Sequence, residues 1–149
     1  MSEDRYEALK LRNQICFPLY ICAKEVTRRY KPYLSEINLT YTQYVVMMAL
    51  WEDSPLTVSG LGRRLLLDSG TLTPLLKRLE EKGYVQRERS EEDERELNVS
   101  LTEKGLALRD KAVSIPGQMA GCVNLTPEDA GDLYRLLYKL INSISEEQA

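Results

Sequence analysis

Residues 68–79, with the sequence DSGTLTPLLKRL, carry the pattern that decides the fold. The leucines in this stretch recur every three or four residues, so they lie on one side of an α-helix and face a core. Asp68 or Ser69 can accept hydrogen bonds from the free N–H groups of the first turn, and Gly83 is typical of a helix end. The segment therefore predicts a capped helix that runs from position 69 to about position 82.

The outward side chains of this helix are suited to reading DNA. Short hydroxyls approach base edges closely, and the methyl group of threonine can contact that of thymine. Lysine and arginine can bind phosphates or guanine. Pro74 has no N–H, so we expect it near the first helical turn, where it presents a rigid apolar surface. The candidate DNA contacts on this helix are Ser69, Thr71, Thr73, Pro74, Lys77 and Arg78.

The sequence changes its period directly after this helix. Apolar and polar side chains alternate over residues 84–89 and again over residues 97–101, with a polar turn between the two runs. This pattern predicts a β-hairpin. At its tip, Arg95 could enter the minor groove of DNA, where the negative potential is concentrated, while Asp93 holds the guanidinium in a bidentate pair. The alternative is that Asp93 and Arg95 only close the turn as a surface ion pair.

A long helix is predicted near the N-terminus, over residues 7–33. Its apolar residues recur at helical spacing and form one broad stripe. A helix of this length, ~40 Å, is longer than a domain of this size can cover, so part of the stripe should meet another subunit. Pro18 lies inside the predicted helix, where it would remove one backbone hydrogen bond and produce a local kink.

The remaining helices are marked by their caps. Thr40 and Gln43 form a capping box for a second helix, and Thr57 can cap a short third helix over residues 58–66. After the hairpin, Thr102 caps a helix that should end near residues 115–117, and Thr126 caps a last helix with proline at its first position. The last helix carries a narrow apolar stripe, formed by Leu133, Leu136, Leu137, Leu140, Ile141 and Ile144.

The predicted order is helix, helix, short helix, helix, hairpin, helix, helix. This is the layout of a winged helix-turn-helix, in an α+β fold that is mainly α. We assign residues 39–102 to this DNA-binding unit and residues 1–38 and 103–149 to a helical dimerisation region, within a single compact protomer. The surplus apolar surface of the N- and C-terminal helices suits an intertwined two-fold dimer.

Composition excludes several function classes. The chain has 149 residues, no histidine and three cysteines. Without histidine there is no Ser-His-Asp or Cys-His site, and three thiols are too few for a four-thiolate zinc site. We therefore expect no enzyme, no metal and no cofactor. No apolar run is long enough to span a membrane, the N-terminus lacks the apolar core of a signal peptide, and the cysteines suit reduced thiols, so we expect a cytoplasmic protein.

The charge is distributed unevenly along the chain. The net charge is −3, which argues mildly against nucleic acid. Residues 63–89, however, contain seven basic and four acidic side chains, whereas the segment from residue 125 onward contains five acidic and two basic ones. A basic middle between acidic ends is compatible with a local phosphate-binding face. The alternative is that these charges only solvate the surface.

Several motifs resemble the MarR family of transcription regulators. They are LTYTQY at 39–44, LDSGTLTPLLKRL at 67–79, DER at 93–95 and LTEKG at 101–105. The run DSGTLTPL is similar to that of the organic-hydroperoxide-sensing branch, the OhrR/SarZ-like repressors. The resemblance covers residues 11–116. It implies a homodimer that places two recognition helices in successive major grooves of a pseudo-palindromic operator in double-stranded DNA, with both wings in flanking minor grooves.

The same branch is marked by the run NQICFPLY at 13–20, in which the resemblance makes Cys16 the peroxide sensor. It also gives Tyr30 and Tyr41 the role of hydrogen-bond donors to the thiolate, and hydrogen bonds to the charged form favour it. Tyr20 lies one helical turn from Cys16 and could line the pocket, and the partner subunit could supply the other tyrosines. By periodicity alone, Cys16 would instead be a small apolar core residue.

The other two cysteines differ in what they can do. Cys22 lies six residues from Cys16, ~9 Å along one helix, which is beyond the ~7 Å limit for a disulfide. Cys122 precedes the last helix, and the resemblance implies a resolving thiol in this region in some members of the branch, which could act across the dimer. Otherwise the sulfenic acid of Cys16 would be capped by a small thiol or oxidised further.

Our hypothesis is a repressor that an organic hydroperoxide releases from DNA. Oxidation of Cys16 would move the first helices and change the spacing of the recognition helices from the ~34 Å of one DNA turn. A rival hypothesis makes a small aromatic ligand in the dimer crevice the signal and Cys16 a bystander. Two further hypotheses are a one-cysteine peroxidase and a protein-binding module.

Overall fold

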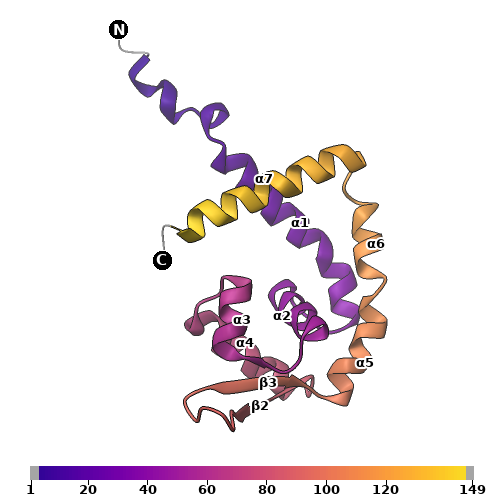
Figure 1. Ribbon diagram of the computed structural model, residues 1–149. Coiled ribbons are helices and arrows are strands. Elements are labelled where there is room, and N and C mark those ends of the chain that lie inside the picture. The colour runs from indigo at the N-terminus through magenta and orange to yellow at the C-terminus, as the bar shows by residue number, and fades with distance from the viewer. Residues whose placement is uncertain (1–3, 147–149) are drawn as a thin grey trace. The chain divides into compact units, whose positions relative to one another are not determined.

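The computed structural model describes residues 4–146, and these divide into two compact units between Ile115 and Pro116 (Figure 1). The first unit begins with the 3₁₀ turns Asp4–Leu9 and Leu11–Asn13. It continues with α1 (Cys16–Glu36), α2 (Tyr41–Glu52), β1 (Leu56–Thr57), α3 (Val58–Leu65), α4 (Ser69–Glu81), β2 (Val85–Arg89), β3 (Leu97–Leu101) and α5 (Glu103–Ala112). The short helix α6 (Ile115–Ala120) crosses into the second unit, which contains α7 (Pro127–Glu146). None of the described helices is long and apolar enough to cross a bilayer.

The core of the first unit lies among α2, α3, α4 and the sheet. The second helix is apolar on most sides, which suits a helix that its neighbours surround. Leu72, Leu76 and Leu79 anchor α4 in this core and are almost completely buried. The predicted inward orientation of the α4 leucines is therefore confirmed, and it leaves the opposite side of α4 exposed to solvent.

Polar caps define where α2, α3, α4, α5 and α7 begin, as the sequence predicts. The Thr40 hydroxyl accepts from the Gln43 N–H at 3.3 Å while the Thr40 N–H donates to the Gln43 amide oxygen at 3.1 Å, a complete capping box. The other caps are Thr57 for α3, Asp68 for α4, Thr102 for α5 and Thr126 for α7. Gly83 follows α4 with a φ of 77°, the left-handed conformation expected of a helix-terminating glycine.

The hairpin forms as predicted, with Val85 opposite Leu101 and Arg89 opposite Leu97. A third strand, β1, pairs antiparallel with the outer side of β3, so the strand order is β1-β3-β2. Strand β1 was not predicted, because a strand of two residues is too short to show an alternating pattern in the sequence.

The first helix differs from its prediction. The α-helix begins at Cys16, and the preceding residues form 3₁₀ turns. Pro18 consequently lies at the third position of α1, where its missing N–H would have had no acceptor within the helix. The prediction that Pro18 removes a backbone hydrogen bond from this helix was therefore wrong. The proline inside α1 is Pro32, near its C-terminal end.

The segment at residues 115–117 also differs from its prediction. It starts α6, where a helix end was expected. Pro116 is the second residue of α6, so its ring replaces an N–H that would have no helical acceptor. In the second unit, Pro127 begins α7 as predicted, and the apolar side chains of α7 stay largely exposed within the chain.

Candidate functional site

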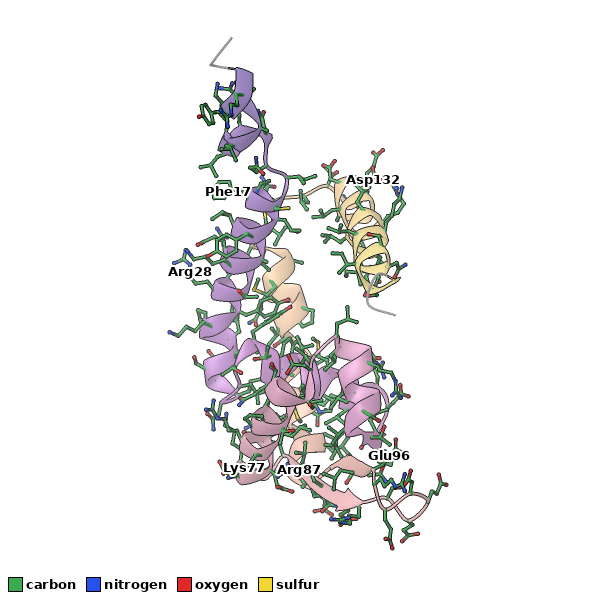
Figure 2. All side chains as sticks on the ribbon, turned by 90° about the vertical axis from the view of Figure 1, so that its left-hand side faces the viewer. Phe17, Arg28, Lys77, Arg87, Glu96 and Asp132 are labelled. Atoms are coloured by element: carbon green, nitrogen blue, oxygen red, sulfur yellow. The ribbon has the colours of Figure 1, made fainter. Side chains whose placement is uncertain are left out.

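The exposed side of α4 is the candidate reading surface. Its proposed DNA contacts are all exposed in the structure: Ser69, Thr71, Thr73, Pro74, Lys77 and Arg78. The carboxylate of Asp68 accepts from the Thr71 N–H at 2.7 Å, which fixes the first turn of the helix. Lys77 lies at the same end of the first unit as the hairpin (Figure 2).

Pro74 differs from its prediction. It is the sixth residue of α4, inside the helix and beyond the first turn. Because proline has no N–H, the carbonyl of Gly70 receives no helical hydrogen bond from it. This carbonyl lies at the exposed start of α4, and Gly70 has no side chain to cover it. Pro74 therefore removes one backbone hydrogen bond from the exposed first half of α4.

A clamp between Glu80 and Arg87, which was not predicted from the sequence, joins α4 to the hairpin. The carboxylate of Glu80 accepts from the backbone N–H of Arg87 at 3.0 Å, from its Nε at 3.2 Å and from its Nη2 at 2.9 Å. These hydrogen bonds with Arg87 hold the pKa of Glu80 below its ordinary value. The clamp fixes the middle of β2 relative to the last turn of α4.

We expect Glu80→Gln to destabilise the fold at neutral pH by less than about 1 kcal/mol, since the pair is only partly buried and is screened by solvent. A carboxylate with a lowered pKa stabilises the folded state above its ordinary pKa of 4.5, and this contribution disappears as the pH falls through the lowered value. Urea unfolding of variant and wild type should therefore differ at neutral pH and converge in acid. Glu81→Gln is the matched control, and a difference that persists in acid would contradict the clamp.

The turn of the hairpin is shaped by Ser90 and Asp93. The Ser90 hydroxyl accepts from the N–H groups of Glu92 and Asp93 at 3.2 and 3.4 Å. The carboxylate of Asp93 accepts from the backbone N–H of Arg95 at 3.0 Å. The expected bidentate pair between Asp93 and the Arg95 guanidinium is absent from the described residues. Asp93 positions the backbone instead, and the Arg95 side chain extends into solvent.

The candidate sensor lies away from this reading surface. Cys16 is the first residue of α1, it is exposed, and none of the three cysteines forms a disulfide within the described residues. Phe17, its neighbour, lies at the opposite end of the first unit from the hairpin (Figure 2). The first turn of a helix presents N–H groups without helical acceptors, and these favour a nearby negative charge. Tyr20, one turn further, is 62% exposed.

The tyrosines expected around the sensor form a cluster of their own. The ring centroids of Tyr30 and Tyr41 are 4.9 Å apart, and those of Tyr30 and Tyr44 are 5.9 Å apart. Burial, and then the neighbouring Tyr41, raise the pKa of Tyr30, so its phenol stays protonated and can donate a hydrogen bond at neutral pH. Tyr44 was not predicted as part of this cluster, because the apolar residues next to it in the sequence indicated a core residue.

This tyrosine cluster cannot reach Cys16 within one protomer. Tyr30 lies fourteen residues after Cys16 on α1, which corresponds to ~21 Å along the helix axis. The structure therefore brings Tyr30 and Tyr41 together but separates both from Cys16 of the same chain. Cys122 lies in the second unit, in the turn after α6, where its thiol donates to the Gln118 carbonyl at 3.5 Å.

A helix-turn-helix with an exposed polar reading helix, followed by a two-stranded wing, defines a winged-helix regulator of transcription. The family model for the transcriptional regulator SarA/Rot matches residues 28–111. The chain is 47% identical to the organic hydroperoxide resistance transcriptional regulator of Bacillus subtilis over 97% of its own length and 99% of the relative. It is 44% identical to the HTH-type transcriptional regulator SarZ of Staphylococcus aureus, with 89% of each chain covered.

Solved structures give the same result. Reduced AbfR bound to DNA superimposes with a TM-score of 0.77 and 35% identity, over 94% of this chain and 99% of that one. AbfR, a protein of Staphylococcus epidermidis, has also been solved overoxidised on DNA and in a disulfide-bonded form. The chain belongs to the MarR family of transcription regulators, in the branch of the organic-hydroperoxide-sensing OhrR/SarZ-like repressors.

Proposed function

We propose that the chain is a homodimeric repressor that binds a pseudo-palindromic operator when reduced and leaves it when an organic hydroperoxide oxidises Cys16. The observation that carries this proposal is the combination, in one member of this family, of an exposed polar face on α4 with an exposed cysteine at the start of α1. The relatives are regulators, and AbfR has been crystallised on DNA.

The dimer would cover apolar surface that each unit leaves exposed. At the N-terminal end of the first unit the exposed apolar residues include Tyr6, Leu9, Leu11, Ile15, Phe17, Leu19 and Tyr20. In the second unit Leu133, Tyr134, Leu136, Tyr138 and Ile144 are at least 47% exposed. A monomer rarely exposes so many large apolar groups in continuous stretches. We therefore propose that residues 1–38 and 103–149 form the dimerisation region and residues 39–102 the DNA-binding unit.

On DNA, α4 would lie in the major groove and the hairpin would reach the minor groove. Ser69, Thr71 and Thr73 would approach base edges, with Pro74 as an apolar contact. Lys77 and Arg78 would bind phosphates or guanine. Asp93 would act by holding the turn in the conformation that projects Arg95, which is the role that its hydrogen bond to the Arg95 backbone supports.

We expect Arg95→Ala to weaken operator binding about 10- to 100-fold, because an arginine inserted in a groove contributes about 1–3 kcal/mol. The dependence of log Kd on log salt should also become shallower, since one cationic contact is lost from each protomer. Fluorescence anisotropy on a duplex selected from a random library by the reduced dimer measures both. Arg109→Ala on α5 is the control. An equal loss of operator affinity in the two variants would contradict a direct contact between Arg95 and DNA.

The sensor chemistry would proceed in two steps. The Cys16 thiolate attacks the terminal oxygen of the hydroperoxide, so that an S–O bond forms and the O–O bond breaks. The sulfur becomes a sulfenic acid, and the departing alkoxide takes up a proton from solvent and leaves as an alcohol. Because Tyr30 and Tyr41 are out of reach of Cys16 in the same chain, we propose that the partner subunit supplies these two donors. Tyr20 would line the pocket from the helix that carries Cys16.

We propose Cys122 as the resolving thiol. Its attack on the sulfenic acid forms a disulfide and releases water. The relative AbfR supports a disulfide as the decisive product, since its overoxidised form has been crystallised on DNA and its disulfide form is also known. In that relative, then, oxygen atoms on the thiol are compatible with binding. Cys22 has no role in this scheme.

We further propose that the protein is a sensor without catalytic turnover and that it works in the cytoplasm, where its operator lies. The test adds cumene hydroperoxide to the reduced dimer on the selected duplex and measures DNA release and peroxide consumption. Release with about one equivalent of peroxide per chain supports the proposal. Continued consumption with a thiol reductant would indicate a peroxidase, and release by a phenolic compound without hydroperoxide would indicate a ligand-controlled regulator.

A further inference from the structure

Two side chains tie the end of the reading helix to the junction between α1 and α2. Lys82, the residue after α4, donates from its Nζ to the Asn38 carbonyl at 2.7 Å and to the Gln43 amide oxygen at 2.9 Å. The Tyr84 hydroxyl donates to the Ile37 carbonyl at 3.4 Å. Since α4 and this junction are far apart in sequence, these contacts connect two elements that the chain itself does not join directly.

The junction is tightly constrained. Only four residues separate α1 from α2, and one of them, Asn38, has a φ of 55° in the left-handed region. Gln43 is only 4% exposed, and its amide oxygen serves two donors, the Thr40 N–H of the capping box and the Lys82 ammonium. Lys82 thus binds the same amide oxygen that closes the capping box at the start of α2. A shift of α1 relative to α2 would change the position of both its acceptors.

The junction is also close to the tyrosine cluster. Tyr41 is the first residue of α2, two positions before Gln43, and its ring contacts that of Tyr30 on α1. The first turn of α2 therefore carries a proposed sensor residue and an acceptor of Lys82. Any movement of Tyr41 that accompanies oxidation would also displace Gln43, because both residues lie in the same helical turn.

On its other side, Lys82 belongs to the reading helix. Its N–H bonds to the carbonyl of Arg78, one of the proposed DNA contacts, at 3.1 Å. Its carbonyl accepts from Lys104 Nζ at 2.8 Å, which holds the helix end against α5. Burial, and then the charge of Arg78, lower the pKa of Lys82, in keeping with an ammonium that is partly withdrawn from water.

We propose that Lys82 is a positioning residue that transmits movement of the α1–α2 junction to the reading helix. In the reduced state its hydrogen bonds hold α4 in register with the junction. When oxidation moves the junction, the same bonds carry the end of α4 with it. This inference rests on the proposed function, because it requires that oxidation of Cys16 changes operator affinity.

The test measures the ratio of operator Kd between the oxidised and the reduced protein, with oxidation verified by mass. Lys82→Met keeps the length of the side chain and removes its donors. We expect its reduced form to bind within about threefold of wild type and its Kd ratio to fall to within about twofold of one. Lys82→Arg restores donors and should recover the ratio. Lys104→Met, at the same helix end but without a contact to the junction, should match wild type.

A ratio in Lys82→Met equal to that of wild type would overturn the inference, and so would equal weakening of both redox forms, which a merely structural role predicts. A wild-type ratio of one would overturn the proposed function and this inference together. If Lys82→Met fails to fold, amide hydrogen exchange on the wild-type protein tests the proposal instead. Oxidation should then lower protection at residues 37–43 and 78–84 together, and a loss confined to residues 37–43 would overturn the proposal.

Discussion

Substitution of Cys16 by serine should leave operator binding intact and abolish its loss on treatment with organic hydroperoxide. Serine has nearly the same shape, so the start of α1 and the remote reading surface should be unchanged. Its hydroxyl, however, is not a nucleophile towards peroxide at neutral pH. Wild type should lose about 5- to 150-fold in affinity, the range of typical coupling between two sites, whereas the variant should lose none. Anisotropy with the selected duplex, before and after cumene hydroperoxide, measures the difference.

The other two cysteines provide matched controls for this result. Cys22→Ser should respond as wild type does. Cys122→Ser should bind the operator and should still be oxidised at Cys16, but without the disulfide it should retain most of its affinity. If hydroperoxide released the Cys16→Ser variant from the operator, Cys16 would not be the sensor. If oxidation released Cys122→Ser from the operator as it releases wild type, only the proposed role of Cys122 as the resolving thiol would be contradicted.

Substitution of Gly105 by alanine should produce the largest loss of stability. A Cβ atom built on Gly105 would overlap the Tyr84 carbonyl oxygen and lie 2.8 Å from the carbonyl carbon, so the backbone of either α5 or the segment before β2 has to move. The same glycine donates its N–H to the Thr102 hydroxyl at 3.0 Å and accepts from Trp51 Nε1 at 2.9 Å, so both contacts resist a shift. The clash should lower the free energy of unfolding by about 3 kcal/mol. The higher helix propensity of alanine should offset about 1 kcal/mol of this loss.

The free energy of unfolding of Gly105→Ala in urea should therefore fall by about 2 kcal/mol. Gly131→Ala is the control. Gly131 lies in α7, a Cβ atom there has no neighbour within 4 Å, and the gain in helix propensity should leave stability equal or slightly higher. A neutral Gly105→Ala would show that α5 and Tyr84 are not packed as closely as the structure has them.

The DNA-binding half of the fold could be predicted because its determinants are local. Each helix start carries a side chain that accepts hydrogen bonds from its own first turn, as Thr40 and Asp68 do. The leucine spacing of α4 and the glycine after it lie within one continuous segment. The wing follows from two alternating runs around a polar turn. None of these signals depends on residues far away in the sequence.

The start of α1 could not be predicted because side chains compete there for backbone groups. Asn13 Nδ2 donates to the Glu7 carbonyl at 2.7 Å, the carbonyl that an α-helix would pair with the N–H of residue 11. The Glu7 carboxylate pairs with Lys10 and Arg12, each at 2.5 Å. Helical spacing of apolar residues does not report on such contacts, so the predicted helix extended too far towards the N-terminus.

The missed parts of the site are contacts between distant segments. The sequence contains Glu80 and Arg87 but does not show that the hairpin turns one towards the other. It contains Lys82, yet nothing in its neighbourhood points to Asn38 and Gln43. For Asp93 and Arg95, the sequence correctly placed both in the turn, but only the geometry shows that the carboxylate binds the Arg95 backbone. Complementary charge therefore suggests partners, and the fold decides which atoms meet.

The most direct test follows DNA release and the chemical state of Cys16 in the same sample. The reduced dimer on its operator is titrated with cumene hydroperoxide, and each point is divided between anisotropy and mass spectrometry of the peptide that contains Cys16. The fraction of DNA released should rise in proportion to the fraction of Cys16 in the disulfide form. Release while Cys16 remains a free thiol, or full conversion of Cys16 to a disulfide with the operator still bound, would contradict it.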